Sequence, residues 1–139
     1  MRPITLAESV ERIRAGEPQD VVLAEFVDSF LVAPDSAARY KAIAKEPSRS
    51  SDVRLDALAG AMGEYLAKHY GLSRIPGWVS APWRCLDEPW FITTSEAPGM
   101  REYLSFASPP EFRSRNIFTD ERPLRRARSH LPFVNTPLR

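Results

Sequence analysis

The chain has 139 residues, with 19 Lys or Arg against 18 Asp or Glu, 13 prolines and one cysteine. This length favours one domain, and a hydrophobic fraction of 43% is ordinary for a folded protein, which excludes a wholly disordered chain. The formal charge of +1 excludes a uniformly basic nucleic-acid coat and a uniformly acidic mimic. The proline content, about twice the average usage, is the one unusual number.

The single cysteine and the apolar stretches indicate the compartment. Cys85 has no partner for an intrachain disulfide, so we expect a reducing, cytoplasmic location and a small buried thiol in an aromatic segment. Residues 1–10 lack the apolar run of a signal peptide. The longest apolar-rich stretch, Val21–Ala33, is interrupted by Glu25 and Asp28 and falls short of the ~20 apolar residues that cross a membrane. We therefore expect no membrane contact.

Three helices are predicted before residue 46. Thr5 with Glu8 three positions later is a capping box, and it starts a helix that ends at Gly16. A second helix is expected to begin at a cap by Asp20 and to stop before Pro34. A third is predicted over Ala37–Lys45.

The clearest predicted element is a helix between Asp52 and Gly71. Its apolar residues recur on one face, Asp52 suits the cap at its start, and Gly71 suits the position just past its end. Gly60 and Gly63 inside it weaken the helix by about 1 kcal/mol each relative to alanine. Their spacing predicts the close approach of another helix.

The second half of the chain differs in amino-acid composition, since nine of the 13 prolines and all three tryptophans lie in the last 64 residues. We expect short turns and one-turn helices here. Helices are predicted over Pro98–Ala107, from Pro110 and from about Pro123 to Ser129, followed by an irregular tail over residues 131–139.

These elements predict an all-α fold in one domain. A small helical bundle over residues 3–71 is followed by a proline-rich layer of short helices and turns over residues 76–128.

Residues for catalysis or for metal and cofactor binding are sparse. His69 and His130 are the only histidines, and with one cysteine they make a zinc site of the usual type nearly untenable. The two acidic pairs, Asp87-Glu88 and Asp120-Glu121, each precede a proline-containing turn, where aspartate commonly caps backbone donors. The glycines form no phosphate-binding loop. We expect no catalytic residue, metal or cofactor; a small enzyme built on Asp87, Glu88 or His130 is the weakest alternative.

Six arginines fall between Arg113 and Arg128, and no lysine follows Lys68. Residues 1–100 hold 11 basic and 14 acidic groups, a balance of −3, whereas residues 101–139 hold 8 and 4, a balance of +4. Arginine favours bidentate pairing with carboxylate or phosphate. Two interpretations remain open: a docking surface for an acidic partner or a nucleic-acid backbone, and a solvated helix face paired with the acidic half.

Eight aromatic side chains lie between residues 78 and 118 and have two interpretations. They could line a ligand pocket or an interaction hot spot, but in a small domain they more often form the core, which is what we expect. They are Trp78, Trp83, Trp90, Phe91, Tyr103, Phe106, Phe112 and Phe118.

Two stretches carry a resemblance: LDEPWF at Leu86–Phe91, and SPPEFRSRNIF at Ser108–Phe118, followed by Leu124 and an Arg-Arg-Ala sequence. With the helix before Gly71 and its Trp-containing turn, they resemble a family of small bacterial proteins common in actinobacteria. Some relatives carry the segment behind a helix-turn-helix domain. The family looks like antitoxin or regulator partners of nucleotidyltransferase-like toxins, and the resemblance covers about residues 55–128.

The resemblance implies a non-enzymatic, antitoxin-like protein that restrains a toxin whose clustered carboxylates hold metal ions. The first 50 residues lack the tight glycine-containing turn of a DNA-reading helix-turn-helix, so direct operator binding is the alternative rather than the leading function. The expected partner-binding residues are Trp90, Phe91, Phe112, Arg113, Arg115, Phe118, Arg125 and Arg126. Of these, the aromatic residues are expected to anchor the contact or the local fold, and the arginines to pair with acidic groups of the partner.

Overall fold

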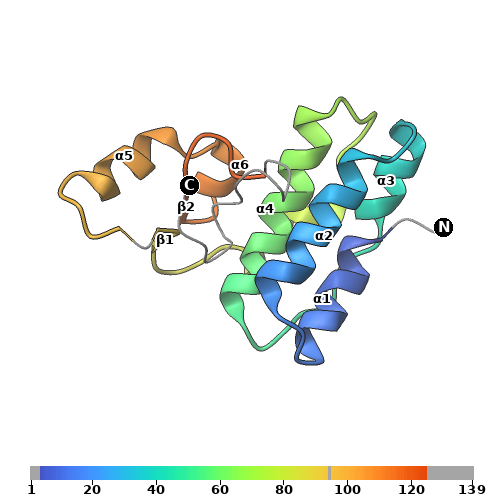
Figure 1. Cartoon of the computed structure of the whole chain (residues 1–139), viewed down its shortest axis with the longest axis horizontal. Helices are drawn as coiled ribbons and strands as arrows, with labels where there is room; N and C mark the ends of the chain where they lie inside the picture. The colour runs from blue at the N-terminus through green and yellow to red at the C-terminus, as the bar shows by residue number, and fades with distance from the viewer. Residues whose placement is uncertain (1–3, 94, 125–139) are drawn as a thin grey trace.

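The computed structural model describes residues 4–93 and 95–124. Four helices come first: α1 (Leu6–Arg14), α2 (Gln19–Leu31), α3 (Ser36–Ala44) and α4 (Val53–His69). Short elements follow: the 3-10 helices η1 (Gly77–Ser80) and η2 (Pro82–Arg84), β1 (Trp90–Phe91), α5 (Met100–Ala107), α6 (Pro110–Arg113) and β2 (Ile117–Phe118). Helices α1 to α4 gather toward one end of the long axis, and α5 lies at the other end (Figure 1).

Local signals fix the ends of the helices. The Thr5 hydroxyl accepts from the Glu8 N–H at 3.0 Å while the Glu8 carboxylate accepts from the Thr5 N–H, which confirms the capping box. Asp52 caps α4, and Gly71 lies just beyond it with φ +65°, as predicted. The start of α2 differs, because the helix begins at Gln19 and so includes Asp20 in its first turn.

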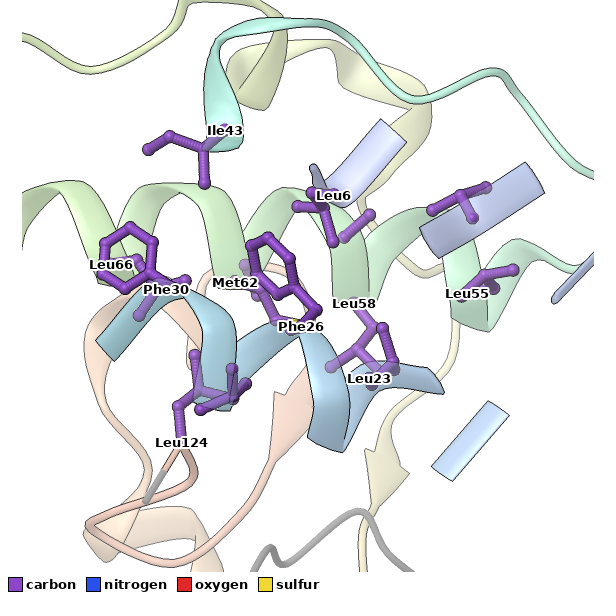
Figure 2. Packing of buried hydrophobic residues seen from close by; sticks show 14 of the residues in the cluster. Leu6, Leu23, Phe26, Phe30, Ile43, Leu55, Leu58, Met62, Leu66 and Leu124 are labelled. Atoms are coloured by element: carbon purple, nitrogen blue, oxygen red, sulfur yellow. The ribbon is translucent and has the colours of Figure 1, made fainter. Parts of the chain in front are cut away.

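The apolar core lies between α4 and the three helices before it (Figure 2). Its α4 side consists of residues no more than 2% exposed: Leu55, Leu58, Met62 and Leu66. Opposite them lie Leu6, Leu23, Phe26, Phe30 and Ile43. Phe112, Ile117 and Leu124 belong to the same cluster, so the proline-rich half and the helical half share one core.

The described residues form a mainly helical protein, as predicted, but the all-α expectation needs one correction. Strands β1 and β2 form a two-stranded parallel sheet that pairs Trp90 with Ile117 and Phe91 with Phe118. Pro89 disfavours helix at the residue before it, so this segment runs extended and finds its backbone partners in β2. The helix predicted from Pro123 falls almost wholly outside the described residues, and the tail over 131–139 does so completely.

The glycines of α4 permit close contacts, although not with another α-helix. A Cβ at Gly63 would lie 2.9 Å from Val79 Cγ1 and 3.0 Å from the Trp78 ring, both on η1. A Cβ at Gly60 would lie 3.0 Å from Arg115 Nε and 3.1 Å from Arg84 Cδ. Side chains of the proline-rich layer therefore replace the predicted helix as the neighbours of α4.

Gly63→Ala is expected to lower the free energy of unfolding by about 1–2 kcal/mol. Overpacking costs more than the ~1 kcal/mol that alanine gains in helix propensity, since Trp78 is held by the bond from its Nε1–H to the Ile43 carbonyl at 2.9 Å. Gly77→Ala is the control, because nothing lies within 4 Å of a Cβ there. Urea unfolding of both variants measures the difference, and equal stabilities would contradict the clash.

Candidate functional site

The EPWF segment forms a surface together with β2. The Trp90 N–H donates to the Asn116 carbonyl at 2.9 Å and the Ile92 N–H donates to the Phe118 carbonyl at 2.8 Å. Asn116 has φ 68°, a left-handed conformation that asparagine adopts more readily than most residues, and its side-chain amide donates to the Leu86 carbonyl at 3.1 Å. The RNIF motif thus turns the chain so that its last two residues pair with β1.

A guanidinium lies on each of the two half-buried aromatic rings of β1. Trp90 is half-buried against the core, and the guanidinium carbon of Arg54 lies 5.0 Å from its ring centre. Phe91 is stacked on Phe118 with ring centres 4.8 Å apart, and the guanidinium carbon of Arg101 lies 4.8 Å from the centre of Phe91. Because successive residues of a strand face opposite sides, these are two cation–ring pairs, one on each side of β1. We call these five residues together the arginine–aromatic surface.

Arg54 and Arg101 are both exposed, and neither forms an ion pair with any residue of the described ranges. A guanidinium stacked on a ring is already oriented, and its N–H fork remains open to a carboxylate or phosphate. Neither arginine could be predicted from the sequence, because each meets its ring only after distant segments come together. No local spacing signals such a contact.

The predicted partner-binding set divides in the structure. Phe91 and Phe118 are half-buried and stack on each other, Trp90 is half-buried against the core, and Phe112 is 0% exposed and belongs to the core. Phe112 meets the Tyr65 ring edge-on with centres 5.7 Å apart, so its ring packs α6 against α4.

The two arginines of the FRSR motif also serve the fold. Arg113 is exposed, yet its Nη1 donates to the Ser108 carbonyl at 2.8 Å, just past the end of α5. Arg115 is 5% exposed and donates to the carbonyls of Glu111 and Val79, both at 2.6 Å. Burial thus keeps the Arg115 guanidinium away from the surface, where the docking role predicted for it would require it. Arg125 and Arg126 lie outside the described residues.

The carboxylate of Glu64 also contacts the buried guanidinium of Arg115. Arg115 Nη1 donates to Glu64 Oε1 at 2.7 Å, and Lys68 Nζ lies 2.9 Å from Glu64 Oε2. Burial raises the pKa of Glu64, but the hydrogen bonds from Arg115 and Lys68 outweigh burial and hold that pKa below its usual value. The pair ties the turn before β2 to α4.

No protein-family model, curated protein or solved structure matches the chain. The surface must therefore be interpreted from its own chemistry.

The other candidate groups are dispersed. Within residues 4–93 and 95–124, no three His, Cys, Asp or Glu side chains gather where a metal ion could bind, and no helix is long and apolar enough to cross a bilayer. His69 stacks on Tyr65 with ring centres 4.0 Å apart, while His130 lies outside these residues. Asp87 and Glu88 are exposed. Cys85 is exposed too, contrary to the buried thiol predicted, because Arg84 occupies the fully buried position in this turn.

Proposed function

We propose that this protein is a non-enzymatic, antitoxin-like interaction protein that binds and restrains a nucleotidyltransferase-like toxin in the cytoplasm. The proposal joins the family resemblance of the EPWF and PPEFRSRNIF segments to one observation. Arg54 on Trp90 and Arg101 on Phe91 present two oriented cations without ion-pair partners among the described residues.

Such a surface suits a partner with clustered carboxylates. A nucleotidyltransferase gathers acidic side chains to hold its metal ions, and these attract guanidinium groups. The aromatic rings supply apolar contact beside each cation, the combination that dominates binding energy at protein interfaces. Because stacking has already restricted the guanidiniums, less side-chain entropy is lost on binding. The protein would act by covering the acidic cleft of the toxin.

The paired substitution Arg54→Gln/Arg101→Gln is expected to weaken binding of the toxin at least ~30-fold, the equivalent of about 2 kcal/mol. Each change removes a cation and keeps a long polar side chain, so the fold is expected to persist. The measurement uses the nucleotidyltransferase-like toxin that the proposal expects the neighbouring gene to encode. Isothermal titration calorimetry gives the affinity, and circular dichroism verifies the fold.

Arg74→Gln is the matched control. The Arg74 guanidinium carbon lies 4.8 Å from the Tyr40 ring centre, so it repeats the stacked geometry, but it follows the opposite end of α4, about 25 Å from the start of that helix. Arg74→Gln is expected to leave binding unchanged.

Reversing the charge of Arg125 and Arg126 by substitution with glutamate is expected to abolish co-purification with the toxin. Wild-type affinity in both the Arg54→Gln/Arg101→Gln variant and the Arg125→Glu/Arg126→Glu variant would refute the proposal.

A transcriptional regulator is the second candidate, because stacked arginine–aromatic pairs also bind nucleic-acid backbones and bases. A regulator is expected to bind duplex or single-stranded nucleic acid with an affinity that falls steeply as the salt concentration rises. The reason is that binding releases counterions from the phosphates, and this release is less favourable at high salt. Fluorescence anisotropy at low and high salt separates the two functions. Absence of nucleic-acid binding at low salt favours the toxin-binding function.

A further inference from the structure

Helix α5 exposes an apolar face that the arginine–aromatic surface does not use. Phe106 is 87% exposed and Tyr103 is 50% exposed, and the two lie three positions apart, which places them on one side of the helix. Leu104 is the buried residue of α5. Large aromatic side chains exposed together commonly mark an interaction site.

Exposed side chains of opposite charge lie near the two ends of α5, the acidic one on α5 and the basic one on α6. Glu102 lies in the first turn, and the guanidinium of Arg113 is held against the carbonyl of Ser108, just past the last turn. Neither Glu102 nor Arg113 forms an ion pair within the described part of the chain. Arg101, also in the first turn of α5, is stacked on an aromatic ring of β1, whereas Glu102 lies one turn before Phe106 on the same side of the helix. That side therefore carries an acid at its start and aromatic rings in its middle, with Arg113 of α6 beyond its end.

We propose that two copies of this chain associate through α5, with their α5 helices antiparallel about a two-fold axis. Such an axis makes every contact occur twice. It brings the first turn of one α5 to the last turn of the other, so that Glu102 meets Arg113 of the second copy. Tyr103 then meets Phe106 of the second copy, and the antiparallel helix dipoles attract.

The charge pattern favours a second copy over another occupant. A partner of one sign would satisfy only one end of α5, whereas an antiparallel copy satisfies both Glu102 and Arg113. Helix α5 lies at one end of the long axis of the molecule, where a second copy can approach it (Figure 1). An eight-residue helix is only about 12 Å long and buries less than a standard interface, so the dimer is weak and depends on concentration.

Sedimentation velocity on the full chain, from micromolar to near-millimolar concentration, tests this dimer. The average mass of the wild-type chain is expected to rise from 15.7 kDa toward twice that value. Phe106→Ser is expected to remain at the monomer mass throughout. Val32→Ser is the control, because Val32 is also an exposed apolar residue, at 63%, but follows α2. It is expected to associate like the wild type.

A charge exchange tests the antiparallel arrangement. Glu102→Arg and Arg113→Glu are each expected to weaken association about tenfold, and the double variant to restore it. The bond from Arg113 to the Ser108 carbonyl is lost in both Arg113→Glu and the double variant, so restoration relative to Arg113→Glu reports the contact between copies. A wild-type chain that stays monomeric, or a double variant no better than the singles, overturns the proposal. Phe106→Ser is expected to bind the toxin normally, so the two proposals fail separately.

Discussion

Replacing Arg84 with alanine is expected to lower the free energy of unfolding by about 3–5 kcal/mol. Arg84 is 0% exposed, which is rare for a charged side chain without a full ion-pair partner. Its nearest carboxylate, Glu46, is half-exposed and 3.5 Å away. The loss should appear in urea unfolding as a lower midpoint with an unchanged slope.

The expected cost follows from what surrounds the guanidinium. Arg84 Nη1 donates to the Asp56 carbonyl at 3.0 Å and Nη2 donates to the Pro47 carbonyl at 2.8 Å. Its guanidinium carbon lies 4.0 Å from the Trp83 ring centre and 4.7 Å from that of Trp78. Alanine takes the guanidinium donor away from the Pro47 carbonyl and a second donor from the Asp56 carbonyl, and it empties the space beside two indoles. Both effects destabilise the folded state.

A second variant separates packing from hydrogen bonding. Arg84→Met keeps most of the volume but not the donors, so we expect a smaller loss of about 1–3 kcal/mol. Arg74→Ala, at an exposed stacked arginine, is the control and is expected to stay within about 0.5 kcal/mol of the wild type. An Arg84→Ala variant as stable as that control would show that the buried network contributes nothing to stability.

Helix ends could be predicted from the sequence because the atoms that determine them are close along the chain. Thr5 and Glu8, three positions apart, complete each other's hydrogen bonds, and Asp35 accepts from the Ala38 N–H at 2.8 Å. Gly71 takes a left-handed conformation that is easiest for glycine. These signals gave the mainly helical class and most helix positions.

Contacts between distant segments could not be predicted in this way. The spacing of Gly60 and Gly63 indicated a close neighbour, but not that Arg84 and Arg115 would cross α4 there. An arginine in a charged, proline-rich segment is normally solvated, so the sequence gives no sign that Arg115 is buried. For the candidate site, the motifs indicated the aromatic residues, while the stacked cations depend on the folded chain.

Replacing Phe112 with alanine is expected to lower the free energy of unfolding by about 3–5 kcal/mol, because the cavity it leaves lies inside the shared core. Phe112 packs edge-on against Tyr65 of α4 and so attaches α6 to that helix. Chemical denaturation measures the loss. Phe106→Ala, at the 87% exposed phenylalanine of α5, removes the same atoms and is expected to change the stability of the dilute monomer by less than about 0.5 kcal/mol.

The same pair of variants distinguishes the two roles open to Phe112 in the sequence, an anchor for a partner and an anchor for the fold. If Phe112 anchors only the fold, Phe112→Ala is destabilised, and toxin binding falls only in proportion to the fraction of the protein that is unfolded. Raising the folded fraction with a stabilising osmolyte such as trimethylamine N-oxide should then recover binding. A Phe112→Ala variant that is as stable as the wild type and yet fails to bind would place Phe112 at the interface and contradict the core assignment.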